Sequence, residues 1–135
     1  MAEREGGCLC GAVRYVLKAE PQVTAVCHCT HCQRQSGGVF SVNLVVPEAA
    51  YAQTGETKVF PDRGDSGKPV WRHFCADCGS PIISTIELMP GVVMVKAGTL
   101  DDLTGITPSL EVYTDHAADW MAPIRGARRF GQAAG

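Results

Sequence analysis

The seven cysteines of this 135-residue chain are its most chemically distinctive residues, because they fall into three tight clusters. The clusters are Cys8-Leu-Cys10, Cys27-His-Cys29-Thr-His-Cys32 and Cys75-Ala-Asp-Cys78. Thiolates at such short spacing can converge on one metal ion, and zinc is the ion for which a tetrahedral set of sulfur ligands is typical. The spacing therefore predicts metal binding.

The favoured grouping joins the first cluster to the third in one closed zinc site of four thiolates. Gly11 and Gly79 directly follow these two clusters, and glycine permits the positive φ that aims backbone N–H groups at sulfur. A rival grouping pairs Cys29 and Cys32 with the third cluster. It is disfavoured because Gln33, not glycine, follows Cys32, and because it divides a compact triplet.

The favoured grouping leaves three thiolates in the middle cluster, with one vacant coordination position on their metal. This is the general form of a reactive zinc site, so Cys27, Cys29 and Cys32 are the predicted catalytic ligands. The alternative is a second closed zinc site with a purely structural role, in which an imidazole supplies the fourth ligand. The candidates for that ligand are His28, His31 and His73.

An open site of this composition favours sulfur chemistry. Zn²⁺ with three thiolates carries one net negative charge, so a bound water is acidified less than on a zinc held by three neutral histidines. A substrate thiol suits a soft metal site better, and the metal promotes loss of its proton. The resulting thiolate can add to a small carbonyl compound, and the reverse reaction cleaves a carbon–sulfur bond.

Arg34, two residues after the triplet, is a further candidate catalytic residue. Its guanidinium could offset the negative charge of the thiolates or hold a carboxylate of the substrate. A solvated surface role explains this arginine equally well. His28 and His31 flank the same sulfurs but are expected at the surface.

The elements that position these residues are predicted to be short β-strands. Apolar and polar residues alternate along residues 13–18 and 40–46, which indicates strands with one buried face. On this pattern Ser41 and Asn43 lie on the solvent-facing side of the second strand. Further β-branched runs, separated by Gly and Pro turn signals, cover residues 23–26, 57–60, 70–74, 82–86, 92–97 and 110–113.

These features predict a mainly β fold of short antiparallel strands, in a sandwich or open barrel organised around the zinc knuckles. The helical signal is weak. Residues 30–35 are a candidate for one or two helical turns, with Thr30 as the N-cap and Gly37-Gly38 as the stop, and residues 101–103 and 115–119 are candidates for brief turns. We expect a single zinc-binding domain over residues 1–135, with an ordered core of about residues 6–130.

Charge and composition argue against several classes of protein. The net charge is −2 and no dense run of Lys and Arg is present, so nucleic-acid binding is not supported. The first residues lack the apolar core of a leader, and no segment has the roughly 20 apolar residues that span a bilayer. The expected location is the cytoplasm, without a membrane partner. There an odd number of cysteines indicates metal ligands rather than disulfides.

Three ordered motifs carry a resemblance to a known family. They are Gly7-Cys-x-Cys-Gly-Ala-Val-Arg-Tyr15, Cys27-His-Cys-x-x-Cys-Gln-Arg-Gln-Ser-Gly37 and His73-Phe-Cys-x-x-Cys-Gly-Ser-Pro81. On these motifs the chain resembles the glutathione-dependent formaldehyde-activating enzyme family, which includes centromere protein V. The resemblance covers nearly the whole chain.

The resemblance implies a β-rich zinc fold related to methionine sulfoxide reductase B and to Rab-associated guanine-nucleotide-release proteins. It implies a structural zinc on the first and third clusters and a catalytic zinc on the middle one, with glutathione bound through its sulfur. The implied activity joins glutathione and formaldehyde into S-hydroxymethylglutathione, and is classed in reverse as a carbon–sulfur lyase. Sulfoxide reductase activity is excluded, because no cysteine follows Cys78.

Two functions from different classes therefore remain. The predicted one is a zinc-dependent carbon–sulfur lyase-type enzyme, with two zinc ions, a small glutathione-like thiol and formaldehyde or another small aldehyde. The alternative is a non-enzymatic zinc-binding interaction module in which both metal sites are structural, as the centromere relative illustrates.

Overall fold

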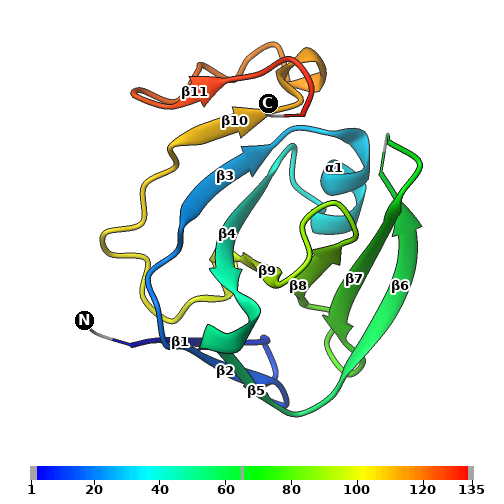
Figure 1. The fold of residues 1–135 in the computed structure, drawn as a ribbon, viewed down its shortest axis with the longest axis vertical. Helices are drawn as coiled ribbons and strands as arrows, with labels where there is room; N and C mark the ends of the chain where they lie inside the picture. The colour runs from blue at the N-terminus through cyan, green and yellow to red at the C-terminus, as the bar shows by residue number, and fades with distance from the viewer. Residues whose placement is uncertain (1–2, 65, 134–135) are drawn as a thin grey trace.

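Figure 1 shows the computed structural model, which describes residues 3–64 and 66–133 as a mainly β fold. The predicted class of short strands in sheets that do not close is confirmed. The strands are β1 (Arg4–Gly7), β2 (Arg14–Leu17), β3 (Val23–Cys27), β4 (Ser41–Pro47), β5 (Tyr51–Thr54), β6 (Thr57–Arg63), β7 (Pro69–Cys75), β8 (Pro81–Ile86), β9 (Val92–Lys96), β10 (Leu110–Val112) and β11 (Arg128–Arg129). The helical elements are α1 (Thr30–Ser36) and the short 3-10 turns Glu48–Ala50, Ala97–Thr99 and Thr114–His116.

The strands form two sheets. The small sheet has the order β1-β2-β5, and the large sheet has the order β11-β10-β3-β4-β9-β8-β7-β6. Neighbouring strands are antiparallel except at one edge, where β10 pairs in parallel with both β3 and β11. The prediction of purely antiparallel strands is wrong there. Parallel strands cannot be joined by a tight turn and need a crossover connection. The long segment between β9 and β10 is such a connection, and it brings β10 alongside β3 in the parallel direction.

Each predicted strand corresponds to an observed one, whereas β1, β5 and β11 were not expected. The first two read Arg-Glu-Gly-Gly and Tyr-Ala-Gln-Thr, without a run of alternating apolar residues, and they become strands by pairing with β2 on either side. Near the C-terminus the carbonyl of Gln132 accepts the N–H of Tyr113 at 3.0 Å.

The hydrophobic core lies where the small sheet meets the central strands of the large one. Tyr15 and Leu17 of β2 cluster with Leu44 of β4 and Val95 of β9, and none of these side chains is more than 2% exposed. The Tyr15 hydroxyl shares a 2.6 Å hydrogen bond with the Thr99 hydroxyl. Burial of this apolar surface is the main favourable contribution to folding. It involves only one face of the large sheet.

The opposite face of the large sheet is also covered, which changes the environment of β4. Ser41 and Asn43 are 4% and 5% exposed, so the prediction that they face solvent is wrong. The helix α1 packs against β4, and in Figure 1 it lies between β4 on one side and β7 on the other. Polar side chains on a strand covered on both faces must find hydrogen-bond partners inside the protein.

The helix α1 has Cys29 as its N-cap rather than the predicted Thr30. The backbone of Cys29 is extended, and its sulfur accepts the N–H of Cys32 at 3.2 Å. The helix stops at Gly37 as predicted, with φ 76° and with its N–H bonded to the carbonyl of Gln33 at 2.9 Å. The N-cap therefore places two sulfur atoms together at the first turn.

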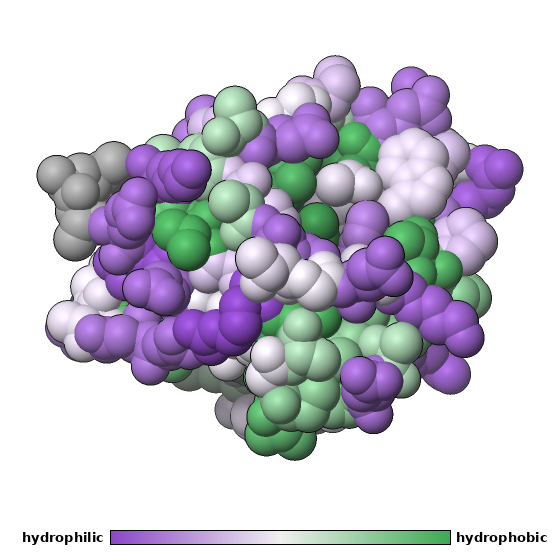
Figure 2. Space-filling model, turned by 90° about the horizontal axis from the view of Figure 1, so that it is seen from below, coloured by the Kyte–Doolittle hydropathy of each residue, from purple (hydrophilic) through white to green (hydrophobic). Residues whose placement is uncertain are grey.

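Hydrophobic and hydrophilic residues are interspersed on the face of the molecule that Figure 2 shows. Large exposed hydrophobic side chains come from separate parts of the chain, among them Leu9, Phe60, Trp71 and Trp120. Within the part of the chain that the structure describes, no helix combines the length and the apolar character needed to cross a membrane.

Candidate metal centres

The cysteines of the first and third clusters meet across the fold. The sulfur atoms of Cys8 and Cys10 lie 3.6 Å apart, and those of Cys10 and Cys75 lie 3.8 Å apart. With the sulfur of Cys78, all four lie within 4.8 Å of one another. A tetrahedron of sulfurs about 2.3 Å from a zinc ion has edges of about 3.8 Å. The donor set and its spacing therefore fit a closed zinc site.

Polar groups around this cluster are placed to stabilise negative charge on sulfur. The N–H of Val13 points at the sulfur of Cys8 at 3.2 Å, and the hydroxyl of Ser80 lies 3.3 Å from the sulfur of Cys78. Hydrogen bonds from the Ser80 side chain and backbone lower the pKa of Cys78 to about 5. Donors of this kind favour the thiolate that a metal requires.

The remaining three cysteines form a separate cluster beside α1. Cys27 ends β3, Cys29 caps α1, and Cys32 lies in its first turn. Their sulfurs lie within 4.8 Å of one another, and no ligand atom of a His, Asp or Glu among the described residues joins them. The cysteines thus group as four and three. Neither the rival pairing nor a trio closed by histidine matches this arrangement.

Three sulfurs this close cannot all be negatively charged without a compensating cation. Hydrogen bonds from Cys27 and Cys29 lower the pKa of Cys32, whereas hydrogen bonds to Cys29 and Cys32, together with burial, raise the pKa of Cys27. Coupled thiols of this kind release protons when a divalent metal binds. Three soft thiolates fit zinc with one position left open.

Two buried cations lie on the sheet beneath this trio. Arg72 on β7 is 5% exposed and Lys96 at the end of β9 is 7% exposed. The Nε of Arg72 donates to Asp62 at 2.8 Å, and the Nζ of Lys96 donates to Asn43 at 2.7 Å. Burial acts against the charge of Arg72, but the hydrogen bond to Asp62 and the attraction of Cys32 raise its pKa. Burial lowers the pKa of Lys96, and the attraction of Cys32 acts against this shift.

A pocket of about 300 Å³ opens beside α1. It is lined by His31, Arg34, Gln35, Phe60, Asp62 and Arg72. The exposed Arg34 belongs to its helical side, and His31 Nδ1 lies 2.8 Å from an oxygen of Asp62. Because His31 lines this pocket and precedes Cys32 in α1, the pocket lies beside the helix turn that carries Cys32.

His28, expected at the surface, is instead 1% exposed. Its Nε2 lies 2.8 Å from Oε1 of Glu111, whose Oε2 accepts the N–H of Ile124 at 3.0 Å and the Nε of Arg129 at 3.2 Å. An ionised carboxylate only accepts hydrogen bonds, so Nε2 of this histidine carries the proton. His28 thus ties the middle cysteine motif to the C-terminal segment and is not part of the sulfur cluster.

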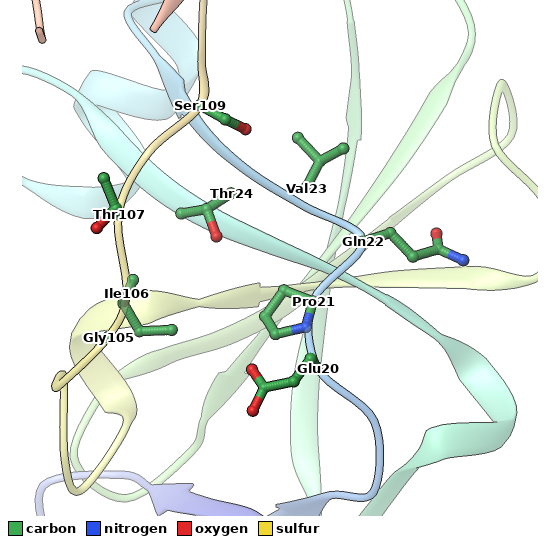
Figure 3. A pocket seen from close by; sticks show the side chains of 9 residues that line it. All are labelled: Glu20, Pro21, Gln22, Val23, Thr24, Gly105, Ile106, Thr107 and Ser109. Carbon is green, nitrogen blue, oxygen red and sulfur yellow. The ribbon is translucent and has the colours of Figure 1, made fainter. Parts of the chain in front are cut away.

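A second pocket, of about 220 Å³, lies between residues 20–24 and 105–109. Figure 3 shows its side chains, with Thr24 between the two segments and the carboxylate of Glu20 at the lower end. None of the described residues that line it is a cysteine or a histidine. This pocket therefore lacks the donor set of the two sulfur clusters.

Comparison with known proteins bears on what these clusters do. The sequence model of a family described as glutathione-dependent formaldehyde-activating enzyme matches residues 3–116, a span that contains both sulfur clusters. The chain belongs to this family. The resemblance drawn from the three cysteine motifs is confirmed. Glu111 lies within the matched span, while its partners Ile124 and Arg129 lie beyond it.

Relatives in this family are distant in sequence. Two of them, from Halomonas elongata and Emericella nidulans, are named "Putative glutathione-dependent formaldehyde-activating enzyme", and each is 28% identical to this chain. The first match covers 87% of this chain and 78% of the relative, and the second covers 60% and 41%. A crystal structure of a Rhodobacter sphaeroides protein has the same fold, with a TM-score of 0.55 and 18% identity over 77% of this chain and 91% of that one.

Sequence reasoning found every sulfur of the two clusters but missed the buried polar residues around the trio. Arg72 and Lys96 each interrupt an apolar strand, in Val-Trp-Arg-His-Phe and Val-Met-Val-Lys-Ala. A lone basic residue within such a strand is the signal that could have found them. Nothing local marks Glu111, because the three groups it binds are distant in the chain.

Proposed function

We propose that this protein is a zinc-dependent enzyme of the carbon–sulfur lyase type, which activates a small glutathione-like thiol for reversible addition to formaldehyde or another small aldehyde. In the forward direction the sulfur bonds to the carbonyl carbon, the C=O double bond becomes a single bond, and the thiol proton is balanced by a proton on that oxygen. With glutathione and formaldehyde the product is S-hydroxymethylglutathione. The reverse reaction breaks the same carbon–sulfur bond.

The observation that carries this proposal is the three-sulfur cluster without a fourth protein ligand, next to an open pocket. Among the described residues the trio offers three ligand atoms where tetrahedral zinc takes four. The family to which the chain belongs is described by glutathione-dependent formaldehyde activation, which requires a place for a thiol. An open fourth position provides such a place.

The two clusters would hold two zinc ions with different roles. Cys8, Cys10, Cys75 and Cys78 would hold a structural zinc, and Cys27, Cys29 and Cys32 would hold a catalytic one. When bound by the trio, zinc would supply an open coordination position and the positive charge that promotes loss of a thiol proton. The four-cysteine site would then stabilise the fold, and the three-cysteine site would carry out the reaction.

The pocket would hold the rest of the thiol substrate and the aldehyde. Arg34 on its helical side would bind a carboxylate of the thiol or stabilise the oxygen anion that forms on the carbonyl carbon. Phe60 provides an apolar wall. The ion pair of Arg72 with Asp62 would hold the guanidinium in place, and His31 contacts the same carboxylate oxygen as Arg72.

A thiol titration tests the proposal. The protein is loaded with Co²⁺ at the trio, and glutathione is added while the sulfur-to-cobalt absorption is recorded. We expect this absorption to grow and saturate, and Cys29→Ser to abolish the response. Serine is a favourable N-cap, so this substitution removes one sulfur while sparing α1. A structural module would ignore added thiols, and that outcome would overturn the proposed function.

Two controls complete this experiment. S-methylglutathione has no free thiol and should produce no change in absorption. Formation of S-hydroxymethylglutathione from formaldehyde, followed by nuclear magnetic resonance, should be faster with the zinc-loaded protein than with Cys29→Ser. Equal rates would contradict the catalytic role of the trio even if thiols bind.

A further inference from the structure

The face of β4 that carries polar residues forms a buried hydrogen-bonded row next to the sulfur trio. The Nζ of Lys96 donates to Oδ1 of Asn43 at 2.7 Å, and Nδ2 of Asn43 donates to Oγ of Ser41 at 3.0 Å. Ser41 is paired with Cys27 across the β3–β4 ladder, so their side chains lie on the same face of the sheet. The row thus leads from Lys96 to the trio.

Among the residues that the structure describes, no carboxylate forms an ion pair with Lys96. The ion pairs of the described residues engage other groups, and the hydrogen bond of Lys96 goes to the neutral amide of Asn43. Arg72, in contrast, is paired with Asp62. A charge buried this deeply is stable only near an opposite charge. Burial lowers the pKa of Lys96 and the charge of Arg72 acts in the same direction, whereas Cys32, Cys27 and Cys29 attract the ammonium. The row through Asn43 and Ser41 leads to these sulfur atoms, which are the opposite charges available to Lys96.

The charges of the site can therefore be counted. Zn²⁺ on three thiolates leaves one net negative charge, Lys96 cancels it, and Arg72 cancels Asp62. A further anionic ligand would then join a site that is close to neutral rather than one that is already negative. In a medium of low dielectric constant this difference strongly affects which ligand occupies the open position.

We propose that Lys96 is an electrostatic positioning residue, whose ammonium, held by Asn43, offsets the charge of the sulfur trio so that a substrate binds there as its thiolate. This inference rests on the proposed function, because it concerns the ligand at the open position. It identifies the residue that makes a zinc site of three thiolates receptive to a fourth sulfur anion. Lys96 touches neither substrate nor metal in this role and acts through the field at the sulfurs.

Two substitutions test the role of Lys96. Lys96→Met keeps the length of the side chain and removes the charge. Asn43→Asp keeps the ammonium and strengthens its contact, but places a carboxylate against it and cancels its charge at the trio. Both should weaken glutathione binding to the cobalt-loaded protein about tenfold, the equivalent of one pKa unit of the bound thiol. Lys58→Met, an exposed lysine on β6, is the matched control and should bind as the unaltered protein does.

The outcomes separate this inference from the proposed function. If the unaltered protein takes no thiol, the proposed function fails and the role of Lys96 falls with it. If the unaltered protein binds glutathione and Asn43→Asp binds it equally well, the electrostatic role is wrong, because a merely structural Lys96 would tolerate that change. Should Lys96→Met not fold, Asn43→Asp alone decides the question.

Discussion

At the scale of single residues, the site depends on buried polar side chains whose partners lie far away in the sequence. Glu111 accepts hydrogen bonds from His28, from the N–H of Ile124 and from Arg129. Burial opposes its ionisation, but the hydrogen bonds from Ile124 and His28 lower its pKa below the ordinary value of 4.5. A carboxylate with a lowered pKa stabilises the fold above its ordinary pKa, and this contribution is lost as the pH falls.

We expect Glu111→Gln to lower the free energy of unfolding at neutral pH by about 2 kcal/mol, because an amide has one acceptor where the carboxylate has two. The difference from the unaltered protein should shrink as the pH falls below 4.5, where Glu111 becomes protonated in the unfolded chain. Urea unfolding at neutral and acid pH measures this difference. Acid also releases metal, but this affects both proteins and therefore cancels in the comparison. Glu56→Gln, at an exposed position, should show neither effect. A difference that stays constant with pH would contradict the prediction.

At the scale of elements, α1 positions two sulfurs of the trio, although it has only seven residues. A helix this short is unstable alone, so its caps and its packing against β4 determine it. Gly37 ends it with φ 76°, and a Cβ added there meets no atom within 4 Å. Any cost of a side chain at this position is therefore one of backbone conformation and not of space.

We expect Gly37→Ala to lower the free energy of unfolding by about 1 kcal/mol, because alanine resists the left-handed conformation. Glutathione binding should be preserved, since Cys29 and Cys32 lie at the opposite end of α1. Gly98→Ala is the matched control, because that glycine has open space and no positive φ. Chemical denaturation of the three proteins measures the effect, and equal stability of the two variants would argue against this account of the C-cap.

At the scale of the whole molecule, the four-sulfur cluster joins the two sheets. Cys8 and Cys10 lie between β1 and β2 of the small sheet, while Cys75 ends β7 and Cys78 precedes β8 in the large one. Cys8 and Cys75 also belong to the hydrophobic core. A metal there would fix one sheet on the other, whereas a metal on the trio would bind only the end of β3 and the N-cap and first turn of α1. The two clusters therefore differ in what the fold requires of them.

We expect Cys75→Ser to remove the cooperative thermal transition, because a structural zinc contributes its binding free energy directly to folding. Cys29→Ser should keep that transition within a few degrees of the unaltered protein. Circular dichroism on heating, with zinc content measured on the same samples, distinguishes the two variants. If both unfold alike, the division into a structural and a catalytic cluster is wrong.

The success and failure of sequence reasoning follow from the range of the interactions involved. The trio and the two outer pairs could be predicted, because their ligands lie within a few residues of one another and local backbone geometry brings them together. Ser41 and Asn43 were misplaced, because alternation shows that a strand has two faces but does not show whether both are covered. The parallel pairing of β10 was missed, because strand direction depends on the path of a long connection.

The sequence by itself determined the chemistry of the ligands, since sulfur type and short spacing belong to each motif before the chain folds. Only the tertiary structure decided that Cys10 meets Cys75, that Glu111 holds His28, and that Lys96 bonds to Asn43. Those contacts join strands from distant parts of the chain, and their formation depends on burial in a shared core. The electric field at the open site is accordingly a property of the whole fold.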